Sequence, residues 1–154
     1  MLTVLKTGLV PASGNLEVIR KAEQVILEQP QECVITYHTL HSGVYTRTIY
    51  LKKGQVIAGA FIKIPTTLIV IGNLNVSIGE EFNTLVGTHI LIAMANRKQI
   101  MVANEDSTII MVFKTMASTI EEAEYEFTDE VDNLASRLPT AINYIKIGEQ
   151  LCQE

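Results

Sequence analysis

The sequence is poor in the residues that build disulfide frameworks, metal sites and membrane spans. Cysteine occurs twice and tryptophan not at all, and Cys33 and Cys152 stand far apart with no metal-binding spacing. We therefore expect reduced thiols rather than a disulfide framework. No apolar run approaches the roughly 18 residues of a membrane-spanning helix, so we expect no membrane contact. The first residues, MLTVLKTGLVPASG, lack the ordered regions of a secretory signal, which predicts a cytoplasmic protein.

Motifs of common catalytic sites are also missing. No serine lies in a Gly-x-Ser-x-Gly elbow, and the glycines are spaced as turn residues rather than as a phosphate-binding loop. His38 and His41 fall on a strand at a spacing that sends them to opposite faces, so the pair is not expected to chelate one ion. His89 stands alone in an apolar run and is interpreted as a structural histidine. We predict no enzymatic activity, no metal and no cofactor.

Charge is unevenly distributed along the chain. The net charge is -5; residues 43–117 contain seven Lys/Arg against four Asp/Glu, whereas residues 118–154 contain two against nine. A nucleic-acid-binding protein normally carries a concentrated basic face, so no nucleic-acid polymer is expected as a partner. The mildly basic middle region leaves room for a small anionic ligand.

The sequence is rich in short β-type runs, and these dominate the middle of the chain. Hydrophobic residues make up 47% of the sequence, which favours a deep core, a subunit interface or both. The runs are rich in Val, Ile, Thr and Phe with turn residues between them, which predicts a β-barrel body over 33–115 in a single domain of 1–154. The runs are VYTRTIYL, QVIAGAFIKI, TLIVIGNLNVSI, THILIAMA, QIMVANE and TIIMVFKT, and Gly72-Asn73 is expected to end one strand.

Helix signals lie on either side of this body. Asn15 is a candidate N-cap for an N-terminal helix over 15–29, which ends before Pro30. Ser118-Thr119-Ile120-Glu121 has the form of a capping box and opens an acidic, helical tail over 118–152. Pro139 divides this tail, and a second helix is expected from Thr140 to Leu151. Residues 1–12 are expected to contain a short edge strand.

Two basic groups are candidates for ligand contact. Alternation along 44–51 places Arg47 on one face with Tyr45, and if that face is the interior the guanidinium needs a carboxylate or an anionic ligand. The alternative is that Arg47 faces solvent or pairs with the acidic tail. Arg97 and Lys98 fall in a polar stretch that we interpret as an exposed turn, with contact to a ligand at the barrel mouth as the alternative.

The stretch from His41 to Glu126 resembles the small cupin-like proteins of bacteriophages and prophages. The resemblance covers somewhat more than half of the chain and rests on an ordered series of short motifs. These are Gly43-Val44-Tyr45-Thr46-Arg47, then Gly54, Gly59 and Gly72, then Asn96-Arg97-Lys98, and then Glu105-Asp106-Ser107-Thr108. It implies a mainly β, cupin-like jelly-roll barrel with an N-terminal helix and C-terminal acidic helices.

The resemblance also assigns positions to three metal-binding histidines, and this chain departs from it at all three. Ile62, Thr66 and Phe113 occupy those positions. Isoleucine and phenylalanine offer no lone pair, and a threonine hydroxyl alone is a poor ligand for the ions that imidazole sites hold. The resemblance therefore implies a metal-free, apolar interior, with ligand contact expected from Tyr45, Arg47, Ile62, Thr66, Arg97, Lys98 and Phe113.

Three hypotheses for function follow. The leading one is a non-enzymatic phage accessory protein of the host cytoplasm, which forms homo-oligomers and binds a host protein or a small ligand. A nucleotide that signals host defence is one candidate for this ligand. The alternative is an assembly protein whose barrel and tail form an oligomer. The third is a metal-dependent cupin enzyme whose ligands lie elsewhere in the sequence.

Overall fold

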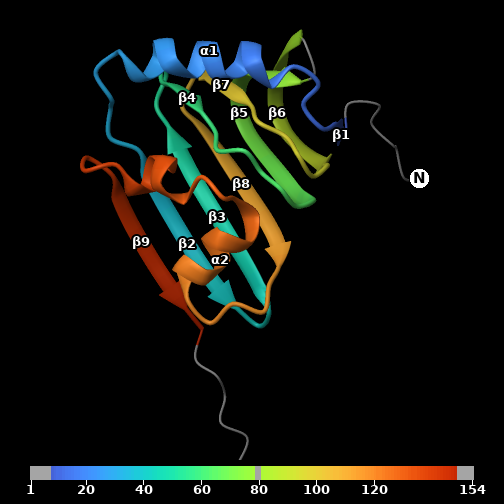
Figure 1. Ribbon diagram of the computed structural model, residues 1–154, viewed down its shortest axis with the longest axis vertical. Coiled ribbons are helices and arrows are strands. Elements are labelled where there is room, and N and C mark those ends of the chain that lie inside the picture. The colour runs from blue at the N-terminus through green and yellow to red at the C-terminus, as the bar shows by residue number, and fades with distance from the viewer. Residues whose placement is uncertain (1–7, 79–80, 149–154) are drawn as a thin grey trace, which may run out of the picture.

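The fold is built mainly from β-strands (Figure 1). The computed structural model describes residues 8–78 and 81–148. Its elements are β1 (Leu9–Val10), α1 (Leu16–Leu27), β2 (Ile35–His41), β3 (Val44–Leu51), β4 (Val56–Ala58), β5 (Thr66–Ile78), β6 (Glu81–Ala93), β7 (Ile100–Ala103), β8 (Ser107–Lys114), α2 (Ile120–Phe127), the 3-10 turns η1 (Val131–Asn133) and η2 (Ala135–Arg137), and β9 (Ile142–Ile147).

The main sheet has the strand order β1-β6-β5-β8-β3-β2-β9. Strand β7 also pairs with β5, and β4 pairs with the other edge of β7. Most neighbouring strands are antiparallel, whereas β1 and β9 pair in parallel at the two edges. In Figure 1, α1 crosses one end of the sheet and α2 lies over β2 and β3. The predicted fold class, a mainly β jelly roll with an N-terminal helix, is confirmed, and of the predicted C-terminal acidic helices α2 is present.

The long hairpin of β5 and β6 bends where two glycines face each other. Gly72 and Gly87 are directly paired, and both have positive φ, at 131° and 88°. A Cβ atom on Gly72 would lie 2.9 Å from the Cα atom of Ser107. The bend allows one half of β5 to pair with β8 and the other half with β7. The prediction that Gly72-Asn73 ends a strand is therefore wrong, because β5 continues through the bend.

Strand β3 has the alternation that the sequence predicts. Tyr45, Arg47 and Leu51 point into the interior and are buried, whereas Val44 and Tyr50 are exposed on the other face. The interior face packs against α2, since Phe127 stacks on Tyr45 with ring centroids 6.1 Å apart. The outer face of the sheet is not covered by any helix that the structure describes (Figure 1).

Both helices begin at capping residues. The side chain of Asn15 accepts a hydrogen bond from Val18 N at 3.4 Å, as expected for the predicted N-cap. In α2 the cap is Thr119, whose side chain accepts from Glu122 N, while Glu122 accepts from Ser118 N. The capping box is thus shifted by one residue from the predicted one. No helix in the described part of the chain is long and apolar enough to cross a membrane.

The second C-terminal helix, predicted from Thr140 to Leu151, is not present in its described part. Residues 142–147 instead form β9, which pairs in parallel with β2, with Tyr144 opposite Tyr37. The alternating sequence INYIKI is β-branched at every second or third position, which favours a strand. The side chain of Asn143 also hydrogen-bonds to His38, which fixes β9 to its neighbour. Residues 149–151 lie outside the described residues, as do residues 1–7 of the predicted edge strand.

Three rows of side chains, aligned by the strand pairing, cross β6, β5, β8, β3, β2 and β9 on the side of the main sheet that faces away from the interior. We call this surface the outer face. Lys146, on the edge strand β9, is the one charged residue in these rows, and the other side chains are Ile, Val, Thr and Tyr. The central row is Tyr144, Tyr37, Thr48, Ile110, Ile69 and Ile90.

Candidate functional site

The barrel interior contains a small apolar cavity of about 90 Å³. Side chains of β3, β4, β5, β7 and β8 line it, and Phe127 and Leu134 close it from the C-terminal segment. The polar side chains in this lining are those of Arg47, Arg97 and Gln99. The interior therefore presents two cationic groups and one amide to a space that is otherwise hydrophobic.

Arg47 points inward and is neutralised by the C-terminal segment. Its Nη1 lies 3.5 Å from Oε1 of Glu124 in α2, and its Nη2 donates to Ser136 Oγ at 2.9 Å. The side chains of Arg47 and Glu124 are only 5% and 2% exposed. Arg137 binds the second oxygen of Glu124 from the solvent side. The inward orientation and the pairing with the acidic tail, which the sequence left as alternatives, occur together.

Arg97 is the second buried cation, and it has no carboxylate partner among the described residues. Its Nη1 donates to Met94 O at 2.7 Å and to Ile64 O at 3.3 Å, and its Nη2 donates to Thr66 Oγ1 at 2.7 Å. Its Nε is buried and has no hydrogen-bond partner in the described part of the structure. Burial lowers the pKa of Arg97 to about 10, so the group stays charged at neutral pH.

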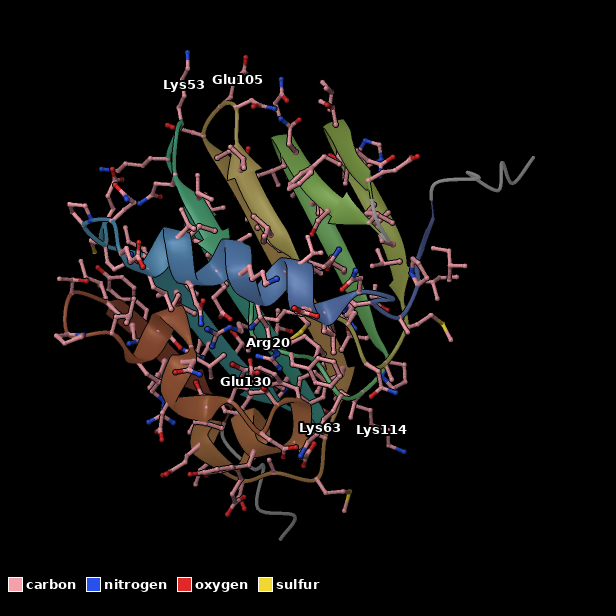
Figure 2. All side chains as sticks on the ribbon, turned by 45° about the horizontal axis from the view of Figure 1, so that its top comes forward. Arg20, Lys53, Lys63, Glu105, Lys114 and Glu130 are labelled. Carbon is pink, nitrogen blue, oxygen red and sulfur yellow. The ribbon has the colours of Figure 1, made fainter. Side chains whose placement is uncertain are left out.

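Lys98 is buried as well, but it belongs to a different contact. Its Nζ lies 2.9 Å from Oε1 of Glu23 in α1 and 3.1 Å from Oε2 of Glu130, and it donates to Gly59 O. Figure 2 shows Arg20 and Glu130 near each other where α1 meets the C-terminal segment, and they form an ion pair at 2.7 Å. The prediction that Arg97 and Lys98 form an exposed turn is wrong, because distant segments supply acceptors for both.

An aromatic cluster lies beside the cavity. The Phe113 ring is 5.3 Å from Tyr45 and 5.9 Å from Phe127 between ring centroids. Tyr45 Oη is 2.8 Å from His38 Nδ1, and His38 Nε2 is 2.8 Å from Asn143 Oδ1. Burial raises the pKa of Tyr45 and lowers the pKa of His38, which keeps both groups neutral.

The predicted ligand-contact residues are only partly brought together. Arg47, Ile62 and Arg97 line the cavity, and Thr66 is attached to Arg97. The rings of Tyr45 and Phe113 belong to the aromatic cluster instead, and Lys98 faces α1. Pairing of Arg47 with the acidic tail was one of the predicted alternatives, but nothing in the sequence singles out Glu124 within that tail.

The positions assigned to metal ligands do not fit a metal ion. Ile62 and Phe113 have no donor atom, and the hydroxyl of Thr66 is engaged by the guanidinium of Arg97. A cation beside that guanidinium would meet like charge. His38 is buried and His41 is exposed on the opposite face, as their spacing predicts. No group of three or more His, Cys, Asp or Glu side chains could hold a metal within residues 8–78 and 81–148.

No family model matches the sequence. No curated protein matches it either. Similar solved structures include a cupin superfamily protein from Desulfitobacterium hafniense DCB-2, at 14% identity and a TM-score of 0.45, covering 73% of this chain and 99% of that chain. A cupin-2 domain protein from Shewanella frigidimarina NCIMB 400 is 12% identical with a TM-score of 0.39, covering 47% of this chain and 72% of that chain.

A salicylate 1,2-dioxygenase from Pseudaminobacter salicylatoxidans is similar over 75% of this chain and 38% of the dioxygenase, at 14% identity and a TM-score of 0.46. At such identities a likeness concerns the fold alone. The activity of that enzyme is therefore not transferred to this chain, and the phage origin stays a prediction.

Proposed function

We propose that this chain is a non-enzymatic binding protein whose barrel interior holds a small anion with an apolar body. The observation that carries the proposal is Arg97, a guanidinium 2% exposed at the wall of an apolar cavity, with no carboxylate partner in the described structure and a buried, unpartnered Nε. A buried charge without a partner costs several kcal/mol. An anion that accepts from Arg97 would remove this cost.

The chemistry of the lining supports a ligand with two unlike ends. A carboxylate accepts hydrogen bonds from a guanidinium edge, and Nε of Arg97 is a buried donor without a partner among the described residues. The remaining lining is aliphatic or aromatic apart from Arg47 and Gln99, and the charge of Arg47 is already matched by Glu124. A short-chain monocarboxylate satisfies both requirements.

The size of the cavity limits the ligand. A cavity of about 150 Å³ accommodates benzene with its six non-hydrogen atoms, so the 90 Å³ here limits the ligand to about four to six non-hydrogen atoms, the range from acetate to butyrate. Typical drug-sized ligands occupy about 300–1,000 Å³. A nucleotide, with its base, sugar and phosphate, is several times larger than benzene, so the geometry argues against a nucleotide in this cavity. The proposed phage role then becomes capture of a small host anion in the host cytoplasm.

Binding is tested by thermal unfolding in the presence of acetate, propionate and butyrate, with butyramide as the uncharged match for butyrate. If the dissociation constant is about 1 mM, 10 mM ligand stabilises the fold by about 1.4 kcal/mol, which raises Tm by roughly 3–5 °C. Butyramide is expected to have no effect. A nucleotide panel measured alongside is expected to leave Tm unchanged.

Two variants locate the site. Arg97→Gln removes the charge, and Ala60→Val fills the cavity while keeping Arg97; both are expected to lose the butyrate effect. Lys53→Gln, which removes a cation from an exposed turn, is the matched control and should keep it. Equal shifts of Tm with butyrate and butyramide, or no shift of Tm with any carboxylate, would show that Arg97 does not bind an anion in this cavity.

An assembly role is the second candidate, and the outer face favours it. The assembly hypothesis of the sequence analysis expects the tail to take part in the oligomer, but β9 of the tail pairs with β2 of its own chain. The outer face, whose one charged residue is Lys146 at its edge, is a different surface for association, and it is independent of the cavity.

A further inference from the structure

We infer that the outer face is the contact surface of a homodimer, in which a second copy of this chain packs sheet against sheet. The inference rests on the assembly candidate and requires nothing of the anion site. Its starting point is the pattern of side chains on both faces of the main sheet.

Both faces of the sheet carry large apolar side chains, and on the outer face these alternate with threonines rather than with charged residues. An antiparallel sheet with one face in water normally alternates apolar residues inward and polar residues outward. Here Ile90 is 65% exposed, Ile92 67% and Tyr144 51%, all on the outer face. Strands with apolar residues on both sides are typical of sheets that are covered on both sides.

The outer face is large enough for a stable interface. Six strands at about 4.8 Å spacing and five residues at about 3.4 Å rise give roughly 29 Å by 17 Å, or about 490 Å² in plan. Two copies would hide about 1,000 Å² before the relief of the side chains is counted, which reaches the area expected of a biological interface. Packed sheets lie about 10 Å apart with strands within about 30° of each other.

Charge favours a second copy over other occupants. A partner with charged side chains would leave them unpaired against this face, so its surface must also lack charge. The corresponding face of another copy meets that condition, and two-fold symmetry brings no like charges together at its centre. The chain carries a net charge of -5, so an anionic membrane would repel it.

The aromatic end of the outer face gives the contact a rigid part. Tyr37 stacks on Tyr144 with ring centroids 4.6 Å apart, and Tyr50 meets Tyr37 edge-on at 5.4 Å. Tyrosines provide large contact areas with few rotatable bonds, which lowers the entropy lost on association.

The test is light scattering coupled to size exclusion, at micromolar concentration and in 50 mM and 1 M salt. The wild-type chain is expected to have twice the 17.1 kDa of one chain at both salt concentrations, because the contact holds no ion pairs. Ile90→Lys and Tyr37→Lys place a charge on the outer face and are expected to give the monomer mass. Val18→Lys, at a 60% exposed position on α1, is the matched control and should leave the dimer intact.

Several results would overturn the inference. These are a monomeric wild type, a dimer that dissociates in 1 M salt, or a dimer that both lysine variants leave unchanged. Flotation of a monomeric wild type with neutral phosphatidylcholine vesicles would instead identify a lipid surface as the occupant. Since the wild type is measured without any substitution, a misfolded variant cannot decide the outcome alone. If the wild-type chain is a dimer but does not bind butyrate, the anion site is refuted and the dimer inference is supported.

Discussion

Replacing Glu124 by glutamine tests how the interior is held together. The change keeps the shape of the side chain and removes the charge that faces Arg47 at 3.5 Å, where both side chains are at most 5% exposed. At an effective dielectric constant of 20, two unit charges at that distance attract by about 4.7 kcal/mol. Breaking a buried pair costs about 3–5 kcal/mol, because the remaining charge stays buried without a partner. We expect Glu124→Gln to lower the free energy of unfolding by roughly 3 kcal/mol.

The matched control is the ion pair between Lys63 and Asp129. Its atoms are closer, at 2.7 Å, but its side chains are 35% and 86% exposed. Asp129→Asn is therefore expected to cost less than about 1 kcal/mol. Urea unfolding at pH 7 measures both variants against the wild type. Equal losses in the two variants, or a loss below about 1 kcal/mol in Glu124→Gln, would refute the view that burial of the pair governs its contribution.

Two further predictions concern pH and the backbone. Burial lowers the pKa of His38 below 6.5, so the unfolded chain binds the proton first as pH falls. The stability from neutral His38 is full above about pH 7 and is lost as pH falls below 6.5 towards the folded-state pKa. The drop in Tm from about pH 7.5 to 5.5 should shrink in His38→Gln and persist in His41→Gln, and equal profiles would contradict this. Gly72→Ala should lower the free energy of unfolding in urea by more than about 3 kcal/mol, because the added Cβ would clash with Ser107. Gly54 also has positive φ but lies in open space, so Gly54→Ala should lower it by about 1–2 kcal/mol. Similar losses in the two variants would show that the backbone is not tightly packed at Gly72.

Secondary-structure elements whose formation depends on residues close together in the sequence could be predicted from local patterns. Strand β3 has the predicted bounds and the predicted division of its side chains between two faces, because this division follows directly from period-two alternation along VYTRTIYL. Asn15 caps α1 as predicted, since the capping interaction involves residues three apart. The barrel body and the N-terminal helix could therefore be predicted from the sequence.

Features that depend on distant partners could not be predicted in this way. Gly72 looks like a strand end on its own, and only its pairing with Gly87 makes it a bend within a continuing strand. Asn96-Arg97-Lys98 is polar enough for an exposed turn, but Thr66 accepts from Arg97 and Glu130 binds Lys98. The tail after Pro139 has mixed helix and strand propensity, and pairing with β2 decides for a strand.

The candidate site shows the same division. Alternation placed Arg47 on the same face as Tyr45, but the sequence left open whether that face points inward and which group pairs with the guanidinium. In the structure the face points inward and Glu124 is the partner. Arg97 was among the predicted contact residues, although its burial was not expected. The apolar lining of the cavity comes from strands that are scattered along the chain, so its size became known only from the structure.

The central claim is that the free Nε donor of Arg97 receives an anion in the barrel interior. The most direct measurement follows the Nε–H signals of the arginines by ¹⁵N NMR during a titration with butyrate, with Arg97 assigned by the signal that disappears in Arg97→Lys. The account predicts a saturable shift of the Arg97 signal and unchanged signals for the exposed guanidinium groups of Arg20 and Arg137. An unchanged Arg97 signal at saturating butyrate, or a shift confined to Arg20 and Arg137, would contradict it.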